Sequence, residues 1–521
     1  MTLGRTRASR ALAGLATAVV LSYGLIACSA SSTSTSTSSG TKSTLTVAIP
    51  TIAPPYSGSS QAINAMRVTS NIFDPLIFKD PATGKLTPGL ATAWKQVSPT
   101  VTDLAVRQGV KFQDGTPMTA GDVAFTLSGQ RLWGPNAIEP STLASTFSDV
   151  GVKNADTVEI TTRQPDPALL DRLASQIGFV VPKAYLLKVG LQQFGVHPIG
   201  TGPYEVKSIT PGQEVVLTAN KDYWGPKPTY ESIKFEQVSD VTARISGLAT
   251  SQYDIATSIP PDQTQQVKAN GQQIVSTQVN NVLQLAFMTN QTGQPTSDAR
   301  VRQAMLLAID RQGIATSLWN GLADVNDGFN LPAYKGFYDG AIQVTKQNLA
   351  EARSLLASAG YRGQPIDLQY IANYYADLDE ALQAMLPMWK TVGLSVVLDP
   401  VANYSLLNYK KLQVYATSSN LQLGNDPISP IYTDWLSPNS TFVKTGRYTP
   451  SAAMSAAGNT LATSTSEAAR QQAFDTIARL WTNEVPSIDL WQPVEVDGIR
   501  SGITYNPDPR YWMRFAPVPG N

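Results

Sequence analysis

Two residue types that carry much of enzyme chemistry are almost absent from this 521-residue sequence, which has one histidine, His197, and one cysteine, Cys28. A metal site built on imidazole or thiolate needs several such ligands, and most hydrolytic triads need a histidine. No Gly-x-Ser-x-Gly nucleophile elbow is present either. We therefore expect no metal, no cofactor and no catalytic residues. An extracytoplasmic hydrolase is the weaker alternative, and we expect a structural role for His197, which precedes Pro198 in a turn.

Cys28 itself lies in a pattern that predicts covalent lipidation. Three arginines in the first ten residues precede an apolar run over 11–21, and Leu25-Ile26-Ala27-Cys28 follows. This order is typical of a bacterial lipoprotein signal, in which the cysteine is acylated and becomes the new N-terminus. The sequence predicts a signal peptide over 1–27, a Ser/Thr-rich tether over 28–44, and attachment through lipid to the outer face of the cell membrane.

Length and charge limit the remaining possibilities. A chain of 521 residues exceeds the roughly 250–300 at which a single core stops growing, so at least two lobes are expected. Lys plus Arg and Asp plus Glu each number 39, and no basic run follows residue 10. The sequence therefore offers no footprint for a nucleic acid.

Alternating strand and helix patterns indicate an α/β fold. Residues 45–49 form a first predicted strand, and the loop after it contains Tyr56 and Ser57, which are candidates for contact with a ligand because such loops line α/β pockets. Thr119 and Asp122 form a capping-box variant that opens a helix. A second helix is expected over 297–309 with Ser297 as its N-cap.

Further elements are expected in the second half of the chain. Strands are predicted over 366–371 and 395–398, and a helix running to Trp389 should be broken or kinked at Pro387. A last long helix is expected over 467–483.

Several motifs occur in an order that resembles the family 5 solute-binding proteins of ABC importers. They are the "GTGPY" segment 200–204, the "GVKFxDGxPxT" segment 109–119, the "NxxYW" segment 220–224 and the "DxRVRQA" segment 298–304. The resemblance implies a two-lobed periplasmic-binding-protein fold with an extra inserted subdomain. The boundaries that we expect are 45–78, 199–284 and 492–521 for lobe I, 79–198 for the inserted subdomain, and 285–491 for lobe II.

The same resemblance implies a function. In the family, two lobes close over a small solute and present it to membrane permease subunits that work with cytoplasmic ATPases. The chain is accordingly expected to be a monomeric receptor that binds a small molecule and no nucleic acid.

The class of ligand depends on one segment. In peptide-binding members, a carboxylate in a "W-x-x-D-x-x-[DE]-P" segment pairs with the peptide ammonium. The matching positions for the tryptophan and the aspartate hold Asn420 and Leu423. An ammonium without its carboxylate is costly to bury, so the resemblance favours a non-peptide organic or aromatic acid. Asp426 could restore the pairing, and an oligopeptide receptor remains the alternative.

Two arginines and several aromatic residues are candidates for holding such an acid. Arg131 and Arg447 could bind a carboxylate with two hydrogen bonds. Stacking candidates, for which core packing is the competing interpretation, are Tyr56, Tyr374, Tyr375, Trp435 and Trp491.

Overall fold

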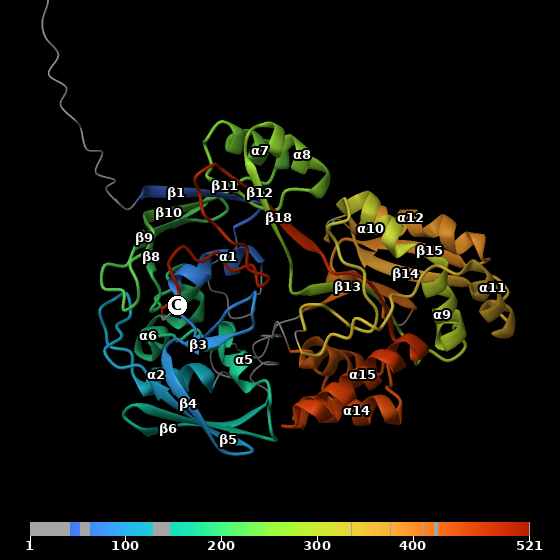
Figure 1. Ribbon diagram of the computed structural model, residues 1–521, viewed down its shortest axis with the longest axis horizontal. Coiled ribbons are helices and arrows are strands. Elements are labelled where there is room, and N and C mark those ends of the chain that lie inside the picture. The colour runs from blue at the N-terminus through green and yellow to red at the C-terminus, as the bar shows by residue number, and fades with distance from the viewer. Residues whose placement is uncertain are drawn as a thin grey trace, which may run out of the picture. The chain divides into compact units, whose positions relative to one another are not determined.

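The computed structural model describes residues 42–52, 63–128, 146–334, 336–372, 374–375, 377–409, 411–420 and 426–519. Its compact unit, Thr41–Asn521, contains sheets of seven, five, four and two strands with helices between them (Figure 1). Strands and helices alternate along much of the chain, so the expected α/β class is confirmed.

We call lobe I the part built on the seven-stranded sheet, whose order is β12-β18-β11-β1-β10-β9-β8. β1 lies at the centre of this sheet, where it pairs in parallel with β10 and β11. Its residues Leu45, Val47 and Ile49 are fully buried. Helices α7 and α8 lie beside β11 and β12 (Figure 1). The elements are β1 (Lys42–Ile49), α1 (Ile63–Ile72), β8 (Tyr204–Thr210), β9 (Glu214–Ala219), β10 (Tyr230–Gln237), α7 (Val241–Ala249), β11 (Ile255–Ala256), η2 (Pro261–Gln263), α8 (Thr264–Ala269), β12 (Gln273–Gln278) and β18 (Val494–Ile499).

The inserted subdomain is built on an antiparallel sheet of order β4-β5-β7-β6. Buried and partly exposed residues alternate along β5 and β7, as expected for strands that cover a core on one face. Its elements are β2 (Ile77–Lys79), β3 (Leu86–Pro88), β4 (Ala91–Ser98), β5 (Val101–Val106), α2 (Ala120–Leu127), β6 (Phe147–Asn154), β7 (Thr157–Thr162), α5 (Leu169–Leu173), η1 (Gln176–Gly178) and α6 (Lys183–Val196).

Lobe II is built on the five-stranded sheet β15-β14-β16-β13-β17, which is covered on both faces. On β13, Leu285 joins the core formed with α9 to α12, whereas Ala286 joins the core formed with η5, α14 and α15. The elements are β13 (Asn281–Phe287), η3 (Pro295–Ser297), α9 (Ala299–Ala308), α10 (Arg311–Trp319), α11 (Leu349–Ser358), β14 (Pro365–Ile371), α12 (Leu378–Thr391), β15 (Ser395–Val401), η4 (Tyr404–Leu406), β16 (Val414–Asn420), the π-helix η5 (Ile428–Leu436), α13 (Thr441–Lys444), α14 (Ala452–Thr463), α15 (Glu467–Glu484) and β17 (Ser487–Trp491).

Two short segments carry the chain between lobe I and lobe II, and they contact each other. Val279 lies between β12 and β13, and its amide donates to the carbonyl oxygen of Pro493, which lies between β17 and β18, at 3.0 Å. The side chain of Gln492 donates to the carbonyl oxygen of Val279 at 2.9 Å. The connection is therefore narrow and hydrogen-bonded, an arrangement typical of hinges.

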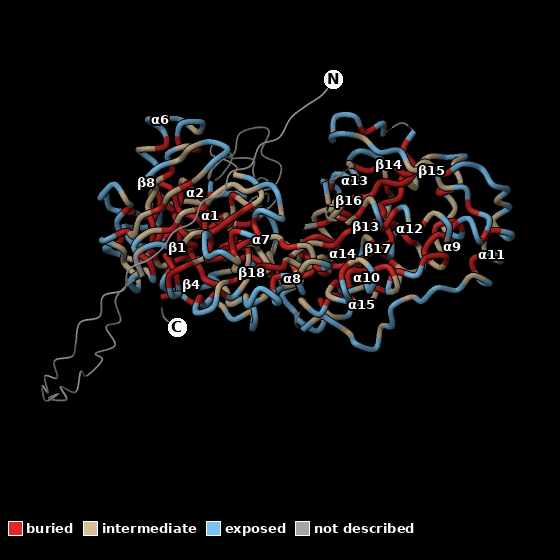
Figure 2. Tube along the Cα trace, turned by 90° about the horizontal axis from the view of Figure 1, so that it is seen from above, coloured by how far each residue is buried: buried red, intermediate tan, exposed pale blue. Residues whose placement is uncertain are grey.

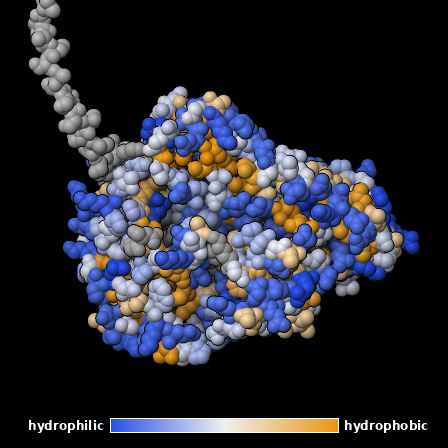
Figure 3. Space-filling view, viewed as in Figure 1, coloured by the Kyte–Doolittle hydropathy of each residue, from blue (hydrophilic) through white to orange (hydrophobic). Residues whose placement is uncertain are grey.

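The observed burial follows these layers. Figure 2 shows buried residues along the strands and exposed residues on the outer loops. In Figure 3, hydrophilic and weakly polar residues cover most of one face, which fits the low charged fraction of 15%.

Local predictions were partly right. The capping box of Thr119 and Asp122 at the start of α2 is confirmed. The predicted N-cap Ser297 is wrong, because Ser297 ends the turn η3 and Asp298 caps α9 through the amide of Arg300. Of the two outcomes expected at Pro387, a break or a kink, the break does not occur, because α12 continues to Thr391. Trp389 is buried, and its indole N–H donates to the carbonyl oxygen of Met305 at 3.0 Å. β1 begins at Lys42, three residues before the expected strand.

The "GTGPY" segment 200–204 packs directly on the end of α1. The amide of Gly202 donates to the carbonyl oxygen of Ile72 at 2.8 Å. Gln113 completes the contact, since its side-chain nitrogen donates to the carbonyl oxygens of Ile72 and Tyr204 at 2.9 and 2.7 Å, and its side-chain oxygen accepts the amide of Gly200 at 2.8 Å. The close approach of two backbones explains why glycine is needed here.

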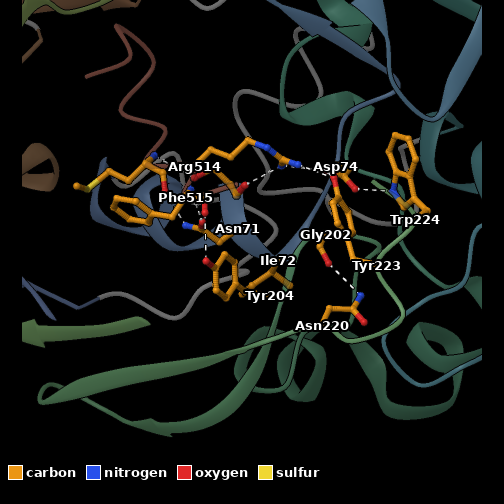
Figure 4. A network of polar contacts seen from close by, with 12 residues as sticks. Asn71, Ile72, Asp74, Gly202, Tyr204, Asn220, Tyr223, Trp224, Arg514 and Phe515 are labelled. Carbon is orange, nitrogen blue, oxygen red and sulfur yellow. Dashed lines mark hydrogen bonds and ion pairs between the residues drawn. The ribbon is translucent and has the colours of Figure 1, made fainter. Parts of the chain in front are cut away.

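A buried carboxylate lies beside this contact (Figure 4). Asp74 is fully buried and accepts hydrogen bonds from the Tyr223 hydroxyl and the Trp224 indole at 3.2 and 2.8 Å. Arg514 forms an ion pair with it at 2.9 Å. Burial raises the pKa of Asp74, while Arg514 and the two aromatic donors act in the opposite direction. The network joins the end of α1, the turn before β10 and the C-terminal segment.

Replacing Gly202 by alanine should destabilise the protein by about 3 kcal/mol or more, because the new Cβ would lie 2.5 Å from the carbonyl carbon of Ile72. The matched control is Gly151→Ala in β6, where the nearest atom to a new Cβ is 3.9 Å away. That control should keep or slightly raise stability, by about 0.5 kcal/mol. Urea unfolding of both variants tests this, and equal losses would contradict it.

Candidate functional site

A pocket of about 490 Å³ lies between the inserted subdomain and lobe II. One wall is the segment that follows β7, and the opposite wall comes from η5, α13 and the loop between them. A volume of this size falls in the range of small-molecule sites, roughly 300–1,000 Å³. The polar side chains that line it include Arg163, Gln164, Asp166, Arg172, Thr433, Asn439 and Lys444.

The inserted wall is held by an internal ion pair. The Arg172 guanidinium lies 2.7 Å from the Asp166 carboxylate, and the two side chains are only 2% and 3% exposed. Asp166 also accepts the amide of Ala168 at 3.1 Å. These contacts order the segment between β7 and α5 and neutralise both charges within the wall.

The other charged groups of the lining are basic. Arg163 and Lys444 line the pocket from opposite walls, and Lys444 is exposed. Among the described lining residues, three are basic, Arg163, Arg172 and Lys444, and one is acidic, Asp166. Tyr432 adds an aromatic surface, and its hydroxyl donates to the Asn459 side chain at 3.3 Å. The arrangement can hold an anionic group beside an aromatic face, through charge-assisted hydrogen bonds.

Two more ion pairs lie near this interface. Lys79 contacts Asp171 at 2.5 Å in the inserted subdomain, and Arg470 donates to both oxygens of Asp426 at 2.8 Å in lobe II. Burial raises the pKa of Asp171, Lys79 lowers it, and the negative charge of Asp426 raises it further. The two pairs are thus close enough to interact, and the Asp426 carboxylate is already occupied.

A polar cluster joins η5 to buried side chains of β13 and β16, and its member Asp434 is half-buried. Asp434 follows the pocket residue Thr433, and burial raises the pKa of Asp434 to about 7, although hydrogen bonds from Thr433 and Ser419 oppose the shift. The Ser419 hydroxyl also accepts from the side chains of Gln284 and Trp435 at 2.6 and 3.4 Å. Asp434 therefore changes charge near neutral pH beside the candidate site.

The aromatic candidates of lobe II separate into buried and exposed groups. Trp435 is fully buried and stacks on Phe442 with ring centroids 4.0 Å apart, and Trp491 is fully buried against Trp319 at 4.4 Å. Both belong to hydrophobic cores. Tyr374 is 55% exposed, and its ring meets Tyr375 edge to face at 4.7 Å.

One charged candidate, Arg447, already has a partner in lobe II. The Arg447 guanidinium lies over the Tyr409 ring at 3.7 Å, outside the pocket lining. His197 is exposed at the C-cap of α6 in the inserted subdomain, and its structural role stays a prediction. None of these four candidates, Arg447, Tyr374, Trp435 and Trp491, lines the pocket described above.

Other candidates lie outside the described residues. These are Cys28, Tyr56, Ser57, Arg131 and Leu423, while Asn420 is described only as the last backbone position of β16. Their roles remain predictions.

Sequence reasoning missed Arg163, Lys444 and Asp434. Arg163 directly follows β7, a strand in which buried and partly exposed residues alternate. A position just after such a strand is a weak signal for a pocket residue. For the other two no signal was available, because the pocket forms from segments more than 250 residues apart.

The raised pKa of Asp434 predicts a pH effect on stability. Its folded pKa of about 7 lies above the ordinary value of 3.8, so the native state keeps a proton that the unfolded chain loses between these values. Stability should therefore fall as pH rises from 4 to 7 and stay lower above it. The Asp434→Asn variant should not show this pH dependence. Its free energy of unfolding should therefore rise relative to that of the wild type as pH rises, by up to about 1.4 kcal/mol per pH unit. Thermal unfolding at pH 5, 6 and 8 measures this difference in stability. The control is Asp149→Asn, which replaces an exposed carboxylate. Parallel pH profiles of the wild type and the Asp434→Asn variant would refute the prediction.

Two further observations concern the described residues only. None of the helices in these ranges is long and apolar enough to span a membrane. Nor do they bring three or more His, Cys, Asp or Glu side chains together in a way that could hold a metal ion.

Comparison with known proteins shows which family the chain resembles. A family model described as "Bacterial extracellular solute-binding proteins, family 5 Middle" matches residues 85–446. The nickel-binding protein NikA of Staphylococcus aureus is 28% identical over 303 residues, 57% of this chain and 57% of that protein. The glutathione-binding protein GsiB of Salmonella typhi is 30% identical over 261 residues, 50% of each. The chain thus matches only about half the length of these curated relatives.

Solved structures show the same fold over nearly the whole chain. The substrate-binding protein CtaP of Listeria monocytogenes superposes with a TM-score of 0.77 at 20% identity, over 92% of this chain and 98% of that one. AgaA of A. tumefaciens R10, solved with agropinic acid, gives 0.77 at 21% identity over 92% and 99%. The two-lobed periplasmic-binding-protein fold is therefore confirmed. Since the family model covers more than half of the sequence, the chain belongs to the bacterial extracellular solute-binding proteins, family 5.

Proposed function

We propose that this chain is the lipid-anchored receptor of an ABC importer for a small non-peptide organic or aromatic acid. The observation that carries the proposal is the pocket between the inserted subdomain and lobe II, whose described lining has more basic than acidic side chains, with Arg163 and Lys444 on opposite walls. An anion between them would attract both walls and so stabilise the closed arrangement. Binding energy that favours the closed state is what a two-lobed receptor needs.

The state of Asp426 supports a non-peptide ligand. Arg470 donates to both of its oxygens, and the amide of Ile428 donates to Oδ1 at 2.9 Å. A peptide ammonium could pair with Asp426 only by displacing Arg470, which would leave a buried guanidinium without its carboxylate. Breaking a buried pair in this way costs about 3–5 kcal/mol.

Family membership alone leaves the ligand class open. AgaA was solved with agropinic acid, whereas the Helicobacter pylori DppA was solved with the peptide STSA. Because both share this fold, the choice between an acid and a peptide rests on the charge of the pocket rather than on the family.

Substituting the two basic residues tests the proposal directly. Small molecules released from the denatured full-length protein are identified by mass spectrometry and retested by calorimetry. We expect acids without a free α-ammonium. Arg163→Gln and Lys444→Gln should each weaken binding by tenfold or more, since a charge-assisted hydrogen bond contributes about 1.5–3 kcal/mol.

The matched control is Lys207→Gln, an exposed lysine on β8 outside the pocket. It should bind as tightly as wild type. Recovery of short peptides, or equal affinities for all three variants, would overturn the proposed ligand class.

Membrane attachment through Cys28 makes a separate prediction. Cys28→Ala should abolish incorporation of labelled palmitate, because no other cysteine is present. Ser29→Ala, one residue on, should leave labelling intact. Labelling of the Cys28→Ala protein, detected on a gel after growth with the label, would show that the lipid is carried elsewhere.

A further inference from the structure

Two acidic side chains lie on the same face of β18, at the lobe I end of the connection between the lobes. Glu495 and Asp497 are two positions apart on this strand, so both side chains leave it on one side. Val496, which lies between them, belongs instead to the core formed with α7 and α8. Glu495 follows Pro493 by two residues, and Pro493 accepts the amide of Val279 in the connection. The two acids therefore lie next to the hinge.

The two carboxyl groups share one hydrogen-bond donor. The amide of Ser258 donates to Oε1 of Glu495 at 2.9 Å and to Oδ1 of Asp497 at 3.2 Å. The two acids are also within hydrogen-bonding reach of each other. Asp497 is 1% exposed, and the side chain of Glu495 is 13% exposed. Because water screens this pair so little, two negative charges at this distance would repel each other.

One guanidinium faces the pair. Arg67 of α1 is 2% exposed and forms an ion pair with Glu495. It also donates to the side chain of Asn64 and, at 3.3 Å, to the hydroxyl of Ser258. A single positive charge is thus in direct contact with a pair of acids.

The other charged and titratable groups around the pair do not replace this cation. Arg244 of α7 donates to the carbonyl oxygens of residues 238, 239, 257 and 258, and its attraction to Glu495 acts through space. Tyr505 and Tyr511 of the C-terminal segment face Arg67 and the acids, and burial raises the pKa of both hydroxyls, which keeps them neutral. Farther out, Asp240 acts on Arg244, and Asp508 acts on Tyr505.

One oxygen of Asp497 lacks a donor. Its Oδ2 is buried, and no N–H or O–H group of the described residues donates to it. Buried polar atoms are nearly always bonded. A proton on Asp497 would remove this problem, because the acid O–H can donate to Glu495, which stays ionised beside Arg67. Burial and the negative charge of Glu495 raise the pKa of Asp497 well above its ordinary value, although Arg67 opposes the shift.

We propose that Glu495 and Asp497 bind one proton between them at neutral pH, as an acid pair that faces the single guanidinium of Arg67. Glu495 balances the charge of Arg67, and the proton removes the charge of Asp497. Release of that proton at higher pH leaves an uncompensated carboxylate inside lobe I, beside the hinge. Lobe I then becomes less stable as the surrounding medium becomes more alkaline.

Replacing the protonated acid by its neutral isostere tests this on the full-length protein. Asp497→Asn should fold, because its amide nitrogen can donate to Glu495 as the acid O–H does. The native state keeps a proton that the unfolded chain releases above about pH 4, so the stability of the wild type falls as pH rises. Between pH 5 and pH 8 its melting temperature should drop relative to that of Asp497→Asn, by about 2 °C or more. The titration of Asp434 is common to both proteins and cancels in this difference.

Two further variants check the count of charges. Asp254 is a buried carboxylate beside β11 that has a cation of its own, Arg500. The matched control Asp254→Asn should therefore lower the melting temperature at both pH values. The double variant Glu495→Gln with Asp497→Asn leaves Arg67 without an acid. It should melt below Asp497→Asn at both pH values, because a buried cation without a partner is strongly destabilising.

Infrared spectroscopy reports the proton directly, since the C=O stretch of a protonated carboxyl group is distinct from the bands of a carboxylate. The difference spectrum between wild type and Asp497→Asn at pH 7 should contain one such band. Its absence, or equal pH dependence of the two melting temperatures, would overturn the proposal, as would a failure of Asp497→Asn to fold. None of these measurements uses a transported solute, so failure here is distinct from failure of the proposed importer function.

Discussion

The fold depends on the buried ion pair between Asp74 and Arg514. Asp74 is fully buried, and three donors from separate parts of the chain converge on it, from Tyr223, Trp224 and Arg514. Losing one partner would leave a charge without compensation in the interior, at a cost of about 3–5 kcal/mol. Through this pair the C-terminal segment contacts the end of α1, so residues far apart in the sequence hold lobe I together.

The motifs that mark the family serve this structure rather than the ligand. Gly202 packs on Ile72, and the side chain of Asn220 donates to the carbonyl oxygen of Gly202 at 3.1 Å. These positions tolerate few residue types because backbones approach closely and buried polar groups need partners. Residues under such constraints identify the fold. They carry no information on the solute.

Charged groups at the interface are largely used in internal pairs. Asp166 pairs with Arg172 and Asp426 with Arg470, so these four groups contribute little net charge to the interface. The proposed ligand class rests on the two other basic residues of the lining, Arg163 and Lys444.

The sequence by itself determined the α/β class, the family and most elements with a clear period, such as the last helix, expected over 467–483 and found as Glu467–Glu484. Local chemistry is enough for these, since caps and apolar faces are encoded by residues a few positions apart. Only the tertiary structure decided which polar residues share a pocket. Trp435 and Trp491 have the composition of ligand contacts but are buried in cores, whereas Arg163 and Lys444, 281 positions apart, face one pocket. Such pairings depend on how separate layers pack, which short-range patterns do not record.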